Sequence, residues 1–262
     1  MDYFCSLYSG STGNSLLYKN NCVILIDCGG SFKKLNESLI DLDLNFDMVN
    51  AILITHEHID HINALKTASK RYRKPIYANK KTLEGIKKRF PDIDQSLFRE
   101  IEKDKAFYIN DIEIIPFNTC HDSADSMGYT LFNGKTKLGI ATDIGKICSD
   151  VEKNLMECQK VLIESNHDVN MLMTNPKYPY VLKRRILSDF GHLSNENCSN
   201  FITRLLNNKT DEFILGHLSR ENNSPYLAFQ QSDSALKCQG ASEKDYTLSV
   251  ADFDKISQKI FL

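Results

Sequence analysis

Short apolar runs that end in polar residues recur along the chain and predict buried β-strands. Runs with the spacing of amphipathic helices lie between them. The expected strands cover residues 23–27, 51–55, 76–78, 112–117, 128–132, 137–141, 161–163, 212–215 and 246–250, the last of which closes the chain. The expected helices cover residues 33–46, 62–72, 81–90, 180–187, a segment capped by Ser194, and about 224–238. No linker or repeat interrupts this succession, so we expect one domain over residues 1–262.

The composition narrows the class of protein but does not indicate its function. The chain has 262 residues, 42% hydrophobic residues and a net charge of -2, which suits a globular protein with a sizeable core and leaves a nucleic-acid partner open. No apolar run reaches membrane-spanning length, and the N-terminus has no secretory signal pattern, so we expect no membrane partner. The eight cysteines contain no Cys-x-x-Cys pair, which favours reduced thiols and a cytoplasmic location.

The densest chemistry follows the strand at residues 51–55. There the sequence reads Thr-His-Glu-His-Ile-Asp-His, so His56, His58, Asp60 and His61 fall within six positions. In an extended segment His56 and His58 project to one side. Imidazoles and a carboxylate gathered this tightly are typical ligands of a divalent transition metal, and a histidine-rich polar loop is the plainer alternative.

Other polar residues stand at the ends of later elements. His121 follows the strand at 112–117, Asp143 follows the strand at 137–141, and His217 follows the strand at 212–215. Before the first histidine motif, Ser9 to Ser15 form a run of small residues, read as a hairpin turn or as a backbone that faces an anion.

The His-x-His-x-Asp-His motif after an apolar strand resembles the metallo-β-lactamase-fold hydrolases, whose fold is an αββα sandwich of two mixed sheets with helices on the outer faces, in the α/β (α+β) class. Within them the chain is most similar to the bacterial YycJ (WalJ) group. Five further segments carry that resemblance: Ser-Gly-Ser-Thr-Gly-Asn-Ser at 9–15, Glu-Ser-Asn-His-Asp at 164–168, the stretch from Pro179 to Ile186, Gly-His-Leu-Ser-Asn-Glu at 191–196, and His-Leu-Ser-Arg-Glu-Asn-Asn at 217–223.

The resemblance implies a centre of two divalent metal ions, zinc or manganese, with iron also compatible. It implies that the first ion is held by His56, His58 and His121. The second would be held by Asp60, His61 and His217, and Asp143 would bridge both. Asp60 would also orient the attacking hydroxide, whereas Asp27 would support the histidine loop.

The resemblance also implies a proton donor that binds no metal. His192 would protonate the leaving oxygen, and Glu164 would hydrogen-bond His192 and keep it protonated. A histidine that only bonds backbone at a helix start is the alternative for His192. Ser219, Arg220 and Asn222 are candidate substrate-binding residues, as are the cations Lys183 to Arg185. The sequence assigns no role to His167.

These features favour a metal-dependent phosphodiesterase acting on nucleic acid. The YycJ resemblance implies a 5′→3′ exonuclease, with DNA favoured over RNA as the substrate. A small-molecule hydrolase that cleaves a thioester, lactone or cyclic phosphodiester is compatible with the same ligands. A metal-binding scaffold without activity is the third hypothesis, and the complete ligand set argues against it.

Overall fold

The computed structural model describes residues 2–262, which form two compact units. Unit 1 holds the described residues up to Pro116 together with Ser123–Met127 and Asp252–Leu262. Unit 2 holds Phe117–Asp122 and Gly128–Ala251. The expectation of a single domain stays a prediction.

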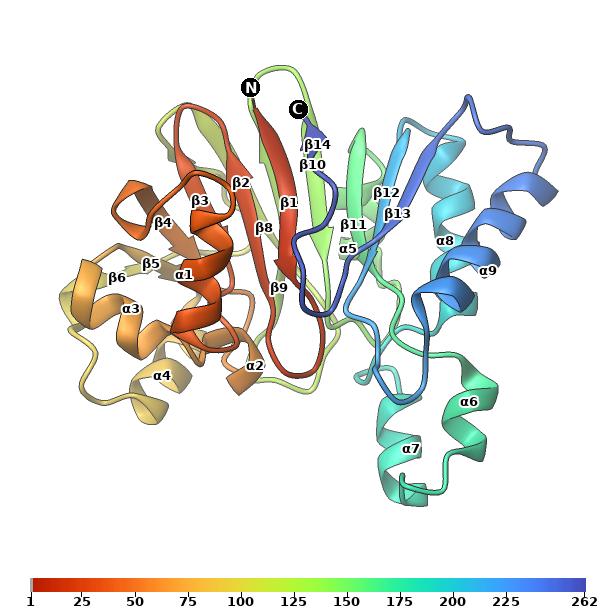
Figure 1. The fold of residues 1–262 in the computed structure, drawn as a ribbon, viewed down its shortest axis with the longest axis horizontal. Coiled ribbons are helices and arrows are strands. Elements are labelled where there is room, and N and C mark those ends of the chain that lie inside the picture. Colours follow the sequence, from red (N-terminus) through yellow and green to blue (C-terminus); the bar gives the residue numbers. More distant parts are fainter. Residues whose placement is uncertain (1) are drawn as a thin grey trace. The chain divides into compact units, whose positions relative to one another are not determined.

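Unit 1 is built on a mixed sheet of seven strands in the described chain, in the order β14-β1-β2-β3-β4-β5-β6 (Figure 1). Strands β3, β4, β5 and β6 are parallel, so their carboxyl ends share one edge. Leu25, Ile52 and Ile76 fill the core from three neighbouring strands. The strands are β1 Tyr3–Tyr8, β2 Ser15–Lys19, β3 Val23–Ile26, β4 Val49–Leu53, β5 Ile76–Ala78, β6 Phe98–Glu100 and β14 Ile260–Phe261.

The helices of unit 1 are α1 Phe32–Ile40, α2 Ile59–Ile62, α3 Leu65–Tyr72 and α4 Lys80–Arg89, with short 3₁₀ turns at Phe46–Met48 and Gln95–Leu97. The expected helix at 33–46 is too long, because Asp43 adopts a left-handed backbone (φ 57°). The expected helix at 62–72 begins later, at Leu65. The residues before Leu65 do not continue this helix, because their backbone groups bond to other segments. The Ala64 amide donates to Cys28 O, and Asp60 O accepts the Asn14 amide.

The second sheet also has seven strands in the described chain, in the order β13-β12-β11-β10-β9-β8-β7. Strands β10 to β13 are parallel, and β9 is antiparallel to β10. The carboxyl ends of β10, β11 and β12 therefore share an edge. The strands are β7 Phe107–Ile109, β8 Ile112–Asn118, β9 Met127–Phe132, β10 Lys137–Ala141, β11 Lys160–Glu164, β12 Glu212–Gly216 and β13 Thr247–Val250.

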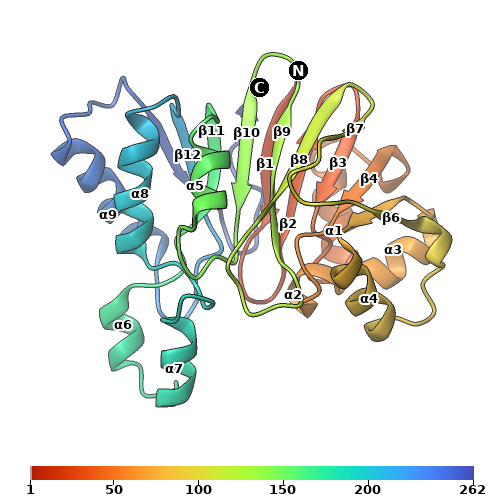
Figure 2. The same ribbon diagram turned by 180° about the vertical axis from the view of Figure 1, so that it is seen from behind.

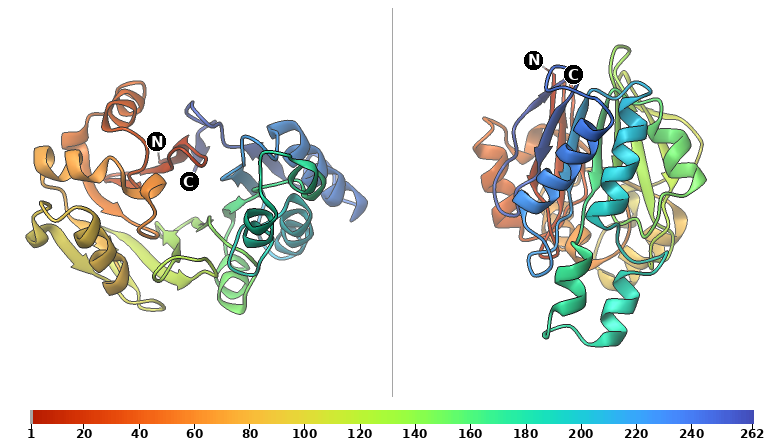
Figure 3. Two further views of the ribbon diagram at one scale, coloured as in Figure 1. Left: turned by 90° about the horizontal axis from the view of Figure 1, so that it is seen from below. Right: turned by 90° about the vertical axis from the view of Figure 1, so that its right-hand side faces the viewer.

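The helices of unit 2 are α5 Ser149–Leu155, α6 Val169–Thr174, α7 Tyr180–Ile186, α8 Asn195–Leu206 and α9 Pro225–Cys238. Helices α8 and α9 pack against each other (Figure 3). Ser194 and Ser224 cap them as side-chain acceptors, and the expected cap at Ser194 is confirmed. Helices α6 and α7 extend beyond the carboxyl ends of β11 and β12 (Figures 1 and 2).

Two mixed sheets with helices confirm the expected α/β class. The expectation that residues 246–250 form the last strand is wrong, because β14 follows and pairs with β1. Within residues 2–262, no helix has the length and apolarity needed to span a membrane. The expected cytoplasmic location stays a prediction.

Candidate metal centre

The histidine loop lies at the carboxyl end of β4 in unit 1. The ring centroids of His56 and His58 are 4.6 Å apart, and those of His56 and His61 are 4.2 Å apart. Helix α2 carries Asp60, and its Oδ2 lies 3.4 Å from Nε2 of His61. The loop therefore brings three imidazoles and one carboxylate together, as the motif predicts.

Asp27 at the end of the neighbouring strand β3 holds this loop. Its Oδ1 accepts the Thr55 amide at 2.8 Å, and its Oδ2 lies 2.7 Å from Nδ1 of His61. Since Nδ1 is bonded to the carboxylate, Nε2 is the atom through which His61 can bind a metal. Asp27 adopts a left-handed backbone (φ 62°), which turns the chain at the strand end. The expected supporting role of Asp27 agrees with these contacts.

Asn14 is a residue of this loop environment that the sequence analysis did not single out. Its Nδ2 lies 3.2 Å from Oδ2 of Asp60 and 3.1 Å from Nε2 of His61. Its own Oδ1 accepts the Gly10 amide. The glycines in this run of small residues predict a turn, and the Gly13 amide closes that turn by donating to Gly10 O. The contacts of Asn14 were not predicted, because they depend on tertiary structure.

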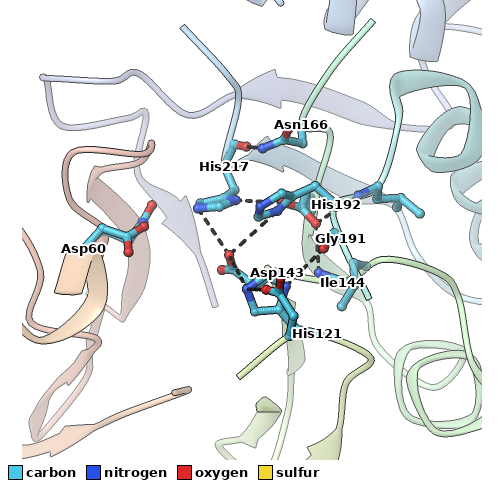
Figure 4. A network of polar contacts seen from close by, with 12 residues as sticks. Asp60, His121, Asp143, Ile144, Asn166, Gly191, His192 and His217 are labelled. Atoms are coloured by element: carbon cyan, nitrogen blue, oxygen red, sulfur yellow. Dashed lines mark hydrogen bonds and ion pairs between the residues drawn. The ribbon is translucent and has the colours of Figure 1, made fainter. Parts of the chain in front are cut away.

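A second cluster stands in unit 2 at the shared carboxyl edge of β10, β11 and β12 (Figure 4). Asp143 follows β10 and His217 follows β12, and His217 Nε2 lies 3.4 Å from Asp143 Oδ1. Nε2 of His121, which follows β8, lies 3.7 Å from the same oxygen. Asp143 and His217 both have a φ of 56°, so each turns sharply out of its strand. Four residues here offer donor atoms within 4.8 Å of one another: Asp143, Glu164, His192 and His217.

The unit 2 histidines are oriented through their Nδ1 atoms. Nδ1 of His217 lies 2.7 Å from Oε1 of Glu164, and Nδ1 of His121 lies 3.0 Å from Gly191 O. Nε2 is again the atom that each ring can offer to a metal. Burial lowers the pKa of His121, which favours the neutral imidazole that metal binding requires.

Glu164 connects His192 with His217. Its Oε1 also lies 2.8 Å from Nδ1 of His192, and its Oε2 accepts the amides of Ile144 and Leu193. Burial alone would raise the pKa of this fully buried carboxyl, but the hydrogen bonds and charges of His192 and His217 lower it far below its usual value. The expected Glu164–His192 bond is confirmed, whereas the bond to His217 was not foreseen.

His192 is more accessible than the other histidines of unit 2. Its side chain is 21% exposed, compared with 4% for His217. Burial lowers the pKa of His192, but the Glu164 carboxylate more than offsets this and the net pKa is raised. The geometry therefore fits a histidine that carries a proton to a ligand in contact with solvent.

The three candidate substrate-binding residues follow His217, and their settings differ. Arg220 is exposed, and Ser219 is partly exposed. Asn222 is buried, and its Oδ1 accepts a hydrogen bond from Asn175 at 2.7 Å. The structure thus places Asn222 to hold this loop, and its expected role in substrate binding stays a prediction.

His167, between β11 and α6, is a buried histidine without an expected role. Its side chain is 1% exposed, and neither ring nitrogen has a hydrogen-bond partner in residues 2–262. Burial lowers its pKa to about 4, so the ring is neutral at physiological pH.

The donor chemistry of both clusters fits divalent metal ions. Each cluster combines imidazoles with carboxylates, and oxygen acceptors orient His61, His121 and His217 through Nδ1, as is usual for metal-bound histidine. Bound metal ions would supply a water of lowered pKa and stabilise negative charge on a substrate.

Comparison with known proteins identifies the family. The model of the family described as beta-lactamase superfamily domain matches residues 23–217. The chain is 36% identical over 241 residues to the exodeoxyribonuclease YycJ of Bacillus anthracis, covering 91% of this chain and 90% of that protein. It is 37% identical over 225 residues to the exodeoxyribonuclease WalJ of Streptococcus pneumoniae strain D39, covering 85% and 83%.

A solved structure supports the same fold. The metallo-β-lactamase-fold protein YhfI of Bacillus subtilis matches with a TM-score of 0.73 and 13% identity, covering 99% of both chains. The family model and the two relatives show that the chain belongs to the metallo-β-lactamase-fold hydrolases and, within them, to the YycJ (WalJ) family.

Proposed function

We propose that the chain is a metal-dependent exonuclease that degrades DNA from its 5′ end. The observation that carries the proposal is the Glu164–His192 pair, 2.8 Å apart, in a chain 36% to 37% identical to two exodeoxyribonucleases. A small-molecule hydrolase would need the same metal ligands, but a proton donor suits the poor leaving group of a nucleic-acid phosphodiester.

The proposed centre holds two divalent ions, zinc or manganese, in the pattern of the family. His56, His58 and His121 would bind one ion, and Asp60, His61 and His217 the other. Asp143 would bridge the two. When bound, such ions lower the pKa of a coordinated water and stabilise charge on a phosphodiester. The geometry within each unit supports its own part of this set.

The protein groups divide the remaining work. Asp60 would orient the attacking oxygen, helped by the amide of Asn14, which lies 3.2 Å from its carboxylate. Glu164 keeps Nδ1 of His192 protonated, so that Nε2 is the position from which a proton can pass to the leaving oxygen. Ser219 and Arg220 would contact phosphate oxygens of the substrate. Asn222 would contribute to substrate binding indirectly, by holding the loop that carries Ser219 and Arg220.

The test uses metal-stripped protein with manganese or zinc added back. Duplex DNA labelled at the 5′ or 3′ end is compared with RNA of the same sequence. A 5′→3′ exonuclease releases the 5′ label at once as a small product and shortens the 3′-labelled strand progressively. His192→Ala should slow both signals by at least about 10², Asp143→Ala should abolish them, and the exposed-surface variant Lys209→Gln should retain them. Absence of cleavage of any nucleic acid with either metal would refute the proposal and favour a small-molecule substrate.

A further inference from the structure

Helix α4 of unit 1 presents an unusual concentration of positive charge. Its sequence contains Lys80, Lys81, Lys87, Lys88 and Arg89, with Glu84 as its one carboxylate, on a chain whose net charge is -2. All five cations are exposed, and we call them the α4 cations. Leu83 and Ile86 on the opposite side fill the core, so the helix is anchored and its charge faces solvent.

The α4 cations have no acidic partner. Within residues 2–262, no carboxylate oxygen lies within salt-bridge distance of any of them. Other cations of unit 1 do pair, as Lys66 does with Asp92 at 3.2 Å and Arg73 with Asp94 at 2.7 Å. The α4 cations are therefore available to an external anion.

Helix stability does not explain this pattern. Cations in the last turn, such as Lys87 to Arg89, interact favourably with the helix dipole. Lys80 and Lys81 stand in the first turn, where the same dipole disfavours positive charge. A solvated helix selected only for stability would carry acidic residues there, so the charge of the first turn calls for another reason.

A groove of about 670 Å³ lies between one face of α4 and the histidine loop. Its lining residues on α4 are Lys81, Glu84, Gly85, Lys88 and Arg89, and the other two are Glu57 and Ala124. The close approach depends on Gly85, because a Cβ there would lie 2.8 Å from Cβ of Glu57. Glu57 stands between His56 and His58, and its Oε1 accepts the Ala124 amide. Figures 1 and 2 show α4 at the same end of the unit 1 sheet as α2.

We propose that the α4 cations and this groove bind the backbone phosphates of the DNA strand next to the phosphate that is cleaved. This rests on the proposed nuclease function and adds where the substrate strand runs on unit 1. The five cations outnumber Glu57 and Glu84, and the groove has room for a sugar-phosphate unit. Binding through phosphates carries no sequence preference, which suits an exonuclease that must move along any strand.

The test measures DNA binding without cleavage. Fluorescence anisotropy on metal-free protein in EDTA follows a labelled single strand of about 20 nucleotides, which is longer than the ~4–16 nucleotides that one single-strand-binding OB fold covers. Salt is varied between about 50 and 200 mM. The variant K81Q/K88Q/R89Q should bind at least about tenfold more weakly, and the slope of log K against log salt should fall by about 2, since each lost contact removes about 0.7.

Two further variants separate local contacts from charge and folding. K153Q/K209Q/K244Q removes the same charge from exposed positions of unit 2, and it should bind within about twofold of the wild type. K81R/K88R keeps the charge and should bind as the wild type does. Thermal unfolding checks that each variant is folded.

The outcomes are distinct. The role of α4 is overturned if K81Q/K88Q/R89Q keeps the salt slope of the wild type, or if the unit 2 control loses as much DNA affinity. The nuclease function stands in that case as long as the wild type cuts DNA. A wild type that neither binds nor cuts DNA, but hydrolyses a small phosphodiester such as bis(p-nitrophenyl) phosphate, overturns the nuclease function and this inference with it.

Discussion

Oδ2 of Asp27 lies 2.7 Å from Nδ1 of His61, inside a fully buried contact that fixes which nitrogen His61 can offer to a metal. Replacing Asp27 with Asn keeps the side-chain shape and tolerates the left-handed backbone, but it removes the charge that selects this tautomer. We expect Asp27→Asn to lower metal affinity about 10- to 100-fold, as measured by calorimetric titration of the stripped protein with zinc.

Asp43→Asn is the matched control for this change. Asp43 is exposed and also left-handed, with a φ of 57°, but it supports no histidine. Its zinc affinity should equal that of the wild type. Equal affinities for wild type and Asp27→Asn would show that the carboxylate does not tune the metal ligand.

The sequence identifies the histidine loop because its chemistry is local, whereas the residues of the second cluster are identified by their place after strands together with the family resemblance. His56, His58, Asp60 and His61 are close in sequence, and Asp143 and His217 each follow an apolar strand that is easy to recognise. The contacts of Asn14 and the second bond of Glu164 cannot be seen in this way, because each joins segments far apart in the chain. Their roles depend on strand order, which one sequence does not specify.

The same distinction explains the errors in the fold. Buried strands such as β3 and β11 are predicted correctly, because burial on both faces produces continuous hydrophobic runs. The strands β6 and β14 are short and partly exposed, and they exist because a neighbouring strand offers hydrogen bonds. The break between α2 and α3 likewise comes from the Ala64–Cys28 backbone bond rather than from local propensity.

Gly29 in unit 1 has no room for a side chain. A Cβ built there would lie 1.7 Å from the backbone oxygen of Asp60, so any other residue must displace the loop that carries a predicted ligand. We expect Gly29→Ala to lower the free energy of unfolding by at least about 1–3 kcal/mol in urea titrations and to weaken metal binding.

Gly134→Ala separates crowding from backbone strain. Gly134 has a φ of 87° and no heavy atom within 4 Å of a built Cβ, so the substitution costs only backbone strain of about 1–2 kcal/mol. Its metal affinity should be unchanged. If Gly29→Ala binds metal as tightly as Gly134→Ala, the loop tolerates displacement and the argument from close packing is wrong.

His192→Ala should separate proton donation from metal binding. The proposed donor makes its strongest contact with Glu164, so its removal should leave the metal content unchanged in elemental analysis. Cleavage of DNA should slow by about 10²–10⁴, the usual contribution of a general acid. Asp143→Ala, in contrast, should lose both bound metal and activity.

A leaving group that needs no proton gives the sharper control. Thymidine 5′-(p-nitrophenyl phosphate) releases a stable phenolate, so His192→Ala should cleave it at close to the wild-type rate. In the wild type, DNA cleavage should decline as pH rises through the raised pKa of His192, because the donor then loses its proton. Equal losses on both substrates would assign His192 to metal or substrate binding instead.

His167 should make the protein sensitive to mild acid. Its ring is 1% exposed with a pKa of about 4, against 6.5 for an unperturbed histidine. Between these values the unfolded chain binds a proton that the folded chain does not, so stability falls as pH falls from about 6.5 towards 4 and is unaffected above that window. The difference in pKa corresponds to about 3 kcal/mol of unfolding free energy at the acid limit.

The measurement is urea unfolding of the metal-free wild type and His167→Leu at pH 7 and pH 4. The free energy of unfolding should fall by about 3 kcal/mol less in His167→Leu than in the wild type. Equal acid sensitivity of the two proteins would mean that the buried ring takes up its proton in the folded state.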